Sequence, residues 1–136
     1  MINMEQWKLL RAMMDRIIPA DDYPGAWEAG VGDYLARQFE GDLQPLVEAY
    51  RVGLDALEAE ALRTAGSSFA GLAAAAQDAL LRRVEEGQVT TSWMVDAAGF
   101  MRMVTEHVMD GYYSDPGNGG NRDGVSWQMI GFEAHE

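Results

Sequence analysis

Cysteine is absent from this chain of 136 residues. Its absence excludes disulfide bonds, zinc sites built on thiolates, iron–sulfur clusters and covalently attached c-type haem. We therefore expect no redox centre held by cysteine, and the composition fits a reducing compartment.

Basic residues are scarce as well. Lys and Arg number 10 against 22 Asp and Glu, which gives a formal net charge of -12. A chain with this charge repels phosphate backbones and anionic lipid surfaces, which argues against binding to nucleic acid.

Long apolar runs are also missing. No run approaches the roughly 20 residues that a membrane span needs. The first five residues, MINME, lack the basic start and the apolar stretch of a secretion signal. We expect no direct membrane insertion and, for the sequence as written, a cytoplasmic location.

The common catalytic motifs are not present either. The sequence has neither a Gly-x-Ser-x-Gly motif nor a Walker phosphate loop. Its histidines, His107 and His135, are not spaced as a metal-binding pair on a helix. We attribute His107 to a favourable interaction with the dipole at the C-terminal end of a helix. We assign no catalytic, cofactor-binding or metal site to this chain, and expect that it is not an enzyme.

The sequence does contain a clear helical pattern over residues 1–113. Apolar side chains recur at spacings of three and four, and no alternating strand pattern is seen. The expected fold is all-α: a single domain over residues 1–136, with a small bundle of about five helices and a long irregular arm at residues 114–136. The expected helices cover residues 7–18, 26–39, 43–66, 73–86 and a fifth segment that is capped by Thr90 or Thr91 and closes at Gly111.

Two polar features of this helical body have structural interpretations. Pro and Asp residues after the first helix predict a turn, because Asp side chains bond to nearby backbone amides. The glutamates from Glu48 to Glu60 are interpreted as a solvated helix face. The residues assigned to the structural turn are Pro19, Asp21, Asp22, Pro24 and Gly25.

The C-terminal arm is rich in both glycine and aromatic residues, and it shows no helical or strand period. A Trp or Tyr side chain left in water forfeits roughly 1.5 to 3 kcal/mol of burial free energy. Either the body of this chain or a second protein must therefore cover these side chains. The sequence leaves both alternatives open.

A calcium site in the arm is an alternative interpretation. Asp115, Asn118, Asn121 and Asp123 supply the hard oxygen ligands that calcium prefers, but their spacing departs from that of an EF-hand loop. This alternative makes the chain a stand-alone helical protein with a calcium-binding C-terminal loop.

Two segments resemble one protein family. Residues 17–31, IIPADDYPGAWEAGV, are similar to the signature "IIPADD-PGA-EAGV" near the start of the gluconate 2-dehydrogenase subunit 3 family. Residues 111–131, GYYSDPGNGGNRDGVSWQMIG, resemble the closing block "G-(F/Y)-(F/Y)-SDP-YGGN-D--GW--IG" of that family. This chain has Gly117 and Asn118 where the family usually has an aromatic residue after Asp-Pro.

The resemblance implies a function for the chain. Members of the family are small subunits of FAD-dependent sugar or alcohol dehydrogenases whose catalytic subunit is a glucose-methanol-choline (GMC) type flavoprotein. It implies a non-catalytic accessory subunit that stabilises and matures the flavoprotein through a large interface, with no cofactor in this chain and FAD in the partner. Family members often carry a twin-arginine leader, so a periplasmic location is expected if such a leader was removed.

The expected interface lies in the arm, since buried Trp and Tyr are frequent interface anchors. Glycine and asparagine also let the backbone lie close to another surface. The residues assigned to the partner interface are Tyr112, Tyr113, Asp115, Pro116, Asn118, Gly119, Gly120, Asn121, Trp127, Ile130 and Phe132.

Overall fold

The computed structural model describes residues 1–114 of the chain. Within these residues the regular structure is helical, and no strand is formed. This confirms the expected all-α bundle of five helices, whereas the arm beyond Ser114 lies outside the described residues. The elements are α1 (Met4–Ile17), α2 (Val31–Phe39), α3 (Val47–Ala65), α4 (Ala74–Glu85) and α5 (Ala97–Tyr112), with 3-10 turns η1 (Gln44–Leu46) and η2 (Phe69–Gly71).

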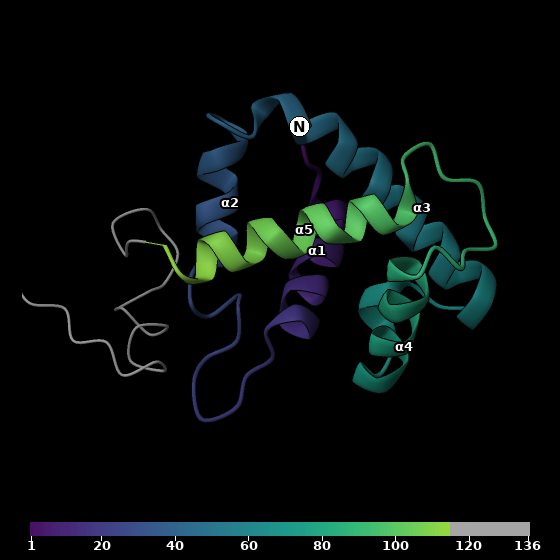
Figure 1. Cartoon of the computed structure of the whole chain (residues 1–136). Helices are drawn as coiled ribbons and strands as arrows, with labels where there is room; N and C mark the ends of the chain where they lie inside the picture. The colour runs from purple at the N-terminus through teal and green to yellow at the C-terminus, as the bar shows by residue number, and fades with distance from the viewer. Residues whose placement is uncertain (115–136) are drawn as a thin grey trace, which may run out of the picture.

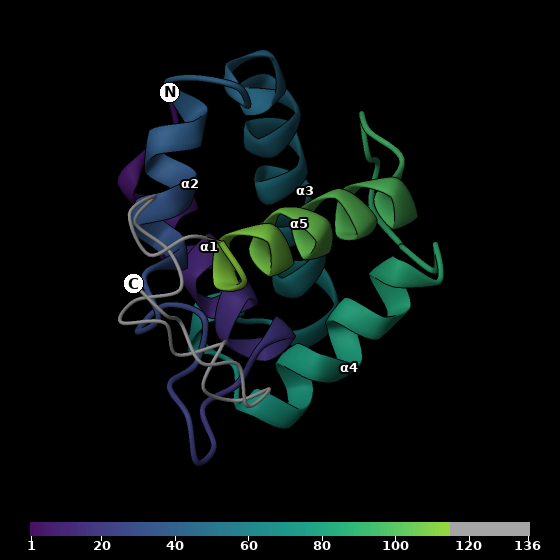
Figure 2. The ribbon, with the colours of Figure 1, turned by 60° about the vertical axis from the view of Figure 1, so that its left-hand side comes forward.

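Helix α5 is the centre of the bundle, because it packs against each of the other four α-helices. Figure 1 shows α5 crossing in front of α1, with α2 at its C-terminal end and α4 near its N-terminal end. The turned view in Figure 2 shows the same order of α2, α5 and α4. The two ends of α5 therefore belong to different surfaces of the molecule.

A line of aromatic rings runs through the core. The ring centroids of Trp7 and Phe39 lie 5.9 Å apart, those of Phe39 and Tyr50 lie 4.8 Å apart, and Tyr50 is followed by Phe100 at 6.2 Å. Trp93 ends the line, 6.1 Å from Phe100. Tilted and edge-to-face pairs at such distances add about 0.5–1.5 kcal/mol each beyond burial. The line connects α1, α2, α3 and α5.

Helices α3 and α5 approach closely at Gly53. A Cβ atom added to Gly53 would lie 2.2 Å from Cε1 of Phe100, which no real side chain tolerates. The missing side chain lets the Phe100 ring lie against the backbone of α3.

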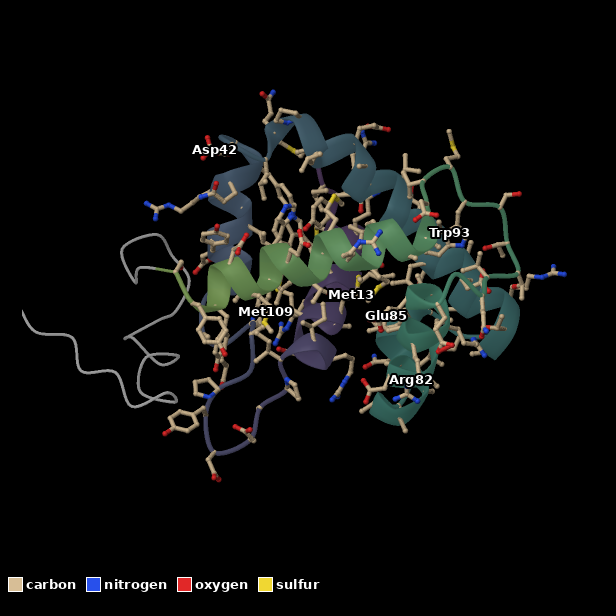
Figure 3. All side chains as sticks on the ribbon, viewed as in Figure 1. Met13, Asp42, Arg82, Glu85, Trp93 and Met109 are labelled. Atoms are coloured by element: carbon tan, nitrogen blue, oxygen red, sulfur yellow. The ribbon has the colours of Figure 1, made fainter. Side chains whose placement is uncertain are left out.

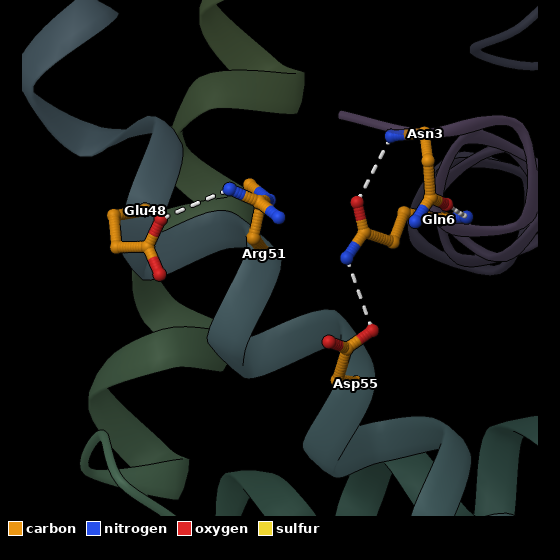
Figure 4. A network of polar contacts seen from close by, with 5 residues as sticks. All are labelled: Asn3, Gln6, Glu48, Arg51 and Asp55. Atoms are coloured by element: carbon orange, nitrogen blue, oxygen red, sulfur yellow. Dashed lines mark hydrogen bonds and ion pairs between the residues drawn. The ribbon is translucent and has the colours of Figure 1, made fainter. Parts of the chain in front are cut away.

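Polar contacts fix the start of α1. The side chain of Asn3 accepts a hydrogen bond from the Gln6 amide at 2.8 Å, and Gln6 Oε1 accepts one from the Asn3 amide at 2.9 Å. This reciprocal pair is a capping box. Gln6 Nε2 also donates to Asp55 of α3 at 3.0 Å, while Glu48 and Arg51 form a separate surface ion pair on α3 (Figure 4).

The second and third helices begin later than expected. Helix α2 begins at Val31 because Gly30 takes a left-handed conformation, with φ of 96°, and residues 26–30 form turns. Leu43 and Leu46 precede α3, since the chain makes the short 3-10 turn at Pro45. The fourth helix agrees with its expected bounds to within one residue.

The expected cap of the fifth helix was wrong. The N-cap of α5 is Asp96, whose Oδ2 accepts a hydrogen bond from the Gly99 amide at 2.7 Å. Thr90, Thr91 and Trp93 lie in the preceding loop. The end of the helix at Tyr112 is one residue beyond the expected position.

Candidate partner interface

The C-terminal end of α5 packs against α2 and against the loop that joins α1 to α2. Tyr112 is fully buried, and its hydroxyl donates a hydrogen bond to the carbonyl oxygen of Pro24 at 3.0 Å. Burial raises the pKa of Tyr112. One residue earlier, a Cβ added to Gly111 would lie 2.7 Å from Cδ2 of Tyr34, so this position requires a small residue.

The α1–α2 loop, residues 18–30, has internal hydrogen bonds that define its shape. The amide of Tyr23 donates to Oδ1 of Asp21 at 2.9 Å, which is an Asx turn. The amide of Trp27 donates to Oδ1 of Asp15 on α1 at 3.1 Å. Asp21 therefore shapes the turn while remaining exposed, and Asp22 is exposed beside it.

Apolar side chains remain accessible around this end of α5. Tyr113 is 44% exposed and Met109 is 42% exposed. The ring of Tyr113 packs edge-on against Tyr112, with centroids 5.4 Å apart. Figure 3 shows Met109 near the end of α5 that lies away from α4. We call the following residues the α5-end surface: Asp21, Tyr34, Asp42, Met109, Asp110 and Tyr113.

The structure describes two of the residues assigned to the partner interface. Tyr112 lies in the core of this chain, and Tyr113 lies at its surface. The others lie outside the described residues: Asp115, Pro116, Asn118, Gly119, Gly120, Asn121, Trp127, Ile130 and Phe132. The alternative calcium loop, Asp115 to Asp123, lies outside them as well.

Glu60 is a buried acceptor that the sequence interpretation missed. The side chain is 1% exposed, so its assignment to a solvated face was wrong. Its carboxylate accepts hydrogen bonds from the amides of Thr90 and Thr91 at 2.9–3.1 Å and from their hydroxyls at 2.7 and 2.6 Å. Burial alone would raise the pKa of Glu60, but these bonds outweigh it and lower the pKa to about 2. Glu60 thereby holds the loop before α5 against α3.

His107 also differs from the sequence interpretation. Its Nδ1 lies 2.8 Å from the hydroxyl of Tyr50, and the two rings are stacked. Burial lowers the pKa of His107, although Asp110 and Glu106 partly oppose the shift. Burial also raises the pKa of Tyr50, so the phenol keeps its proton, and its O–H can donate a hydrogen bond to Nδ1 of a neutral imidazole. The cationic interaction with the helix dipole is therefore replaced by a neutral hydrogen bond.

Metal-binding side chains do not cluster in the described part of the chain. Residues 1–114 contain no group of three His, Asp or Glu side chains arranged to hold a metal ion. A groove of about 610 Å³ lies between the start of α1, α2 and α3, with Ile2, Trp7, Phe39 and Val47 among its lining residues. It is lined mostly by apolar side chains. Among the described helices, none is both long and apolar enough to cross a membrane.

Comparison with known families identifies the chain. The family model for gluconate 2-dehydrogenase subunit 3 matches residues 4–133, so the chain belongs to this family. Membership implies a subunit of a hetero-oligomeric dehydrogenase complex. No curated protein and no solved structure matches the chain.

Proposed function

We propose that this member of the subunit 3 family is the non-catalytic accessory subunit of an FAD-dependent sugar or glucoside dehydrogenase. It stabilises and matures a GMC-type catalytic subunit through a large interface. FAD and the reacting groups belong to the partner, and this chain contributes a surface.

One observation carries the proposal: the two segments that bear the family signatures meet at one end of α5. The first segment, residues 17–31, supplies the carbonyl of Pro24, and the second, residues 111–131, supplies the hydroxyl of Tyr112 that binds it at 3.0 Å. Gly111 of the second segment packs on Tyr34, just after the first. A function shared by the family is best supported at the place where its two signatures converge.

The exposed residues at this place suit an interface. Tyr113 and Met109 keep more than two fifths of their surface exposed, although each is attached to a well-packed helix. Tyr and Met are enriched in protein interfaces, and a Tyr anchor held by its neighbours loses little conformational entropy on binding. An obligate interface buries roughly 2,000 Å² or more, so the arm that follows Ser114 is expected to take part as well.

Co-expression with the flavin-containing catalytic subunit tests the proposal. The wild-type chain is expected to co-purify with that subunit and to raise the amount of soluble, flavin-loaded protein. Tyr113→Ala and Trp127→Ala should each lower the recovery of the complex, with a loss of about 2 kcal/mol for a central anchor. Met94→Ala is the matched control, because Met94 is 88% exposed in the loop before α5.

The same experiment can also refute the proposed function. If the catalytic subunit is equally soluble, equally rich in flavin and equally active with and without this chain, the accessory role is wrong. If Met94→Ala lowers recovery as much as Tyr113→Ala, the interface lies elsewhere.

A further inference from the structure

The α5-end surface collects carboxylates from three separate parts of the chain. Asp110 comes from α5, Asp42 from the turn after α2, and Asp21 from the α1–α2 loop, and all three are exposed. Their negative charges also affect the pKa values of Tyr34 and Tyr112. Burial is the main cause of the raised pKa of Tyr34, and Asp110 and Asp42 raise it further. The pKa of Tyr112 is raised mainly by burial, then by Tyr113, and Asp21 raises it further.

Within residues 1–114 these carboxylates form no ion pair. Among the described residues the ion pairs are Arg16 with Asp78 and Arg51 with Glu48, and neither pair involves the α5-end surface. The whole chain has a net charge of -12, so its remaining charges reinforce the negative potential.

The centre of the same surface is apolar. Tyr113 and Met109 are exposed and flank Asp110 in the chain, and the ring of Tyr113 packs edge-on against the buried Tyr112. An apolar centre with a polar or charged rim is the usual anatomy of a protein interface. Because like charges across an interface repel, the negative charge of the rim indicates that the partner surface is positively charged.

We infer that the α5-end surface docks on a basic patch of the catalytic subunit, where Lys and Arg side chains surround an apolar depression that receives Tyr113. This inference rests on the proposed function and adds the chemistry of the partner surface. The acidic rim repels the same surface of a second copy of this chain, and the proposed function supplies the catalytic subunit as the occupant. Part of the affinity is electrostatic and decreases as salt screens the rim.

The test uses the purified complex of the two full-length subunits. Its dissociation constant is measured by dilution and mass photometry at about 0.05 M and 0.5 M NaCl, where screening differs strongly. The variant combines Asp21→Asn, Asp42→Asn and Asp110→Asn. Asparagine keeps the oxygen that accepts the Tyr23 amide in the Asx turn, so the variant removes charge while preserving the turn.

The matched control combines Glu5→Gln, Glu85→Gln and Glu86→Gln. It changes the net charge equally at exposed positions on α1 and at the end of α4. Figure 3 shows Glu85 on the side of the molecule away from Asp42. Circular dichroism verifies that both variants keep the helical content of the wild type.

The expected result is a dissociation constant about tenfold weaker for the Asp variant at low salt, as three exposed charge pairs would give, with a much smaller salt dependence. The control variant should follow the wild type. An unchanged Asp variant, or an equal weakening in the control, overturns the inference while the accessory function stands. Self-association of this chain through the same three Asp residues also overturns it. Failure of the wild-type chain to bind any catalytic subunit overturns the proposed function, and this inference with it.

Discussion

Replacing Glu60 by glutamine should destabilise the fold at neutral pH. The carboxylate accepts hydrogen bonds from two amides and two hydroxyls while being 1% exposed. In Glu60→Gln one carboxylate oxygen becomes an amide NH2 group, which cannot accept a hydrogen bond, so at least one donor on Thr90 or Thr91 loses its partner. The loop that leads into α5 is then held less firmly.

The magnitude follows from the pKa of Glu60. A value of about 2 in the folded chain, against 4.5 for an ordinary glutamate, corresponds to about 3 kcal/mol of stability. Because the folded pKa is lowered, this contribution is fully present above pH 4.5 and is lost as the pH falls toward 2. We expect Glu60→Gln to lower the free energy of unfolding by about 2–3 kcal/mol at pH 7, and the difference from wild type to shrink below pH 4.5.

Urea denaturation followed by circular dichroism at pH 7, 4 and 3 measures this difference. Glu48→Gln is the matched control on the same helix, because Glu48 is an exposed partner of Arg51 and should cost less than about 1 kcal/mol. A loss at pH 7 no larger than that of the control, or a difference that does not change with pH, would refute the role given to Glu60.

Two further predictions concern the end of α5 and its partly buried histidine. Tyr112→Phe removes the hydrogen bond to Pro24 and should lower the free energy of unfolding, measured by urea denaturation, by about 1 kcal/mol. Tyr113→Phe is the control at an exposed tyrosine and should change the free energy of unfolding by less than half as much. Equal effects of the two substitutions would contradict the contact between Tyr112 and Pro24. Because the pKa of His107 is lowered in the folded chain, neutral His107 supports the fold above pH 6.5, and stability decreases as the pH falls through its folded pKa. His107→Gln should remove part of the decrease in the free energy of unfolding between pH 7.5 and 5.5. An identical pH profile in both proteins would contradict a partly buried neutral imidazole.

The existence of the five helices could be predicted because each one carries an apolar stripe that faces the core. The stop of α1 before Pro19 and the end of α3 at Gly66 also follow from local chemistry, since Pro cannot continue a helix and Gly66 takes a positive φ of 69°. These features depend on residues within one or two turns of each other.

The missed features depend on contacts between distant residues. Thr90 and Thr91 have the chemistry of helix caps, yet their donors bind Glu60, some 30 residues earlier in the chain. The position of Glu60, three residues after the buried Leu57, was the one local sign that it could face inward. His107 likewise finds Tyr50, which is 57 residues away. A single sequence does not specify such pairs.

The candidate interface was predicted only in part. The sequence indicated the importance of residues 17–31 and 111–131, and the family match supports the resemblance that both segments carry. Their meeting through Tyr112 and Pro24 required the packing of α5 against the α1–α2 loop. The division between the buried Tyr112 and the exposed Tyr113 follows from the orientation of the last turn of α5.

The most direct test of the central claim is the flavin content of the catalytic subunit expressed with and without this chain. The account predicts that soluble, flavin-loaded catalytic subunit is recovered as a complex with this chain, and that its yield falls sharply when the chain is omitted or carries Tyr113→Ala. Recovery of a soluble, flavin-loaded and fully active catalytic subunit in the absence of this chain would contradict the account.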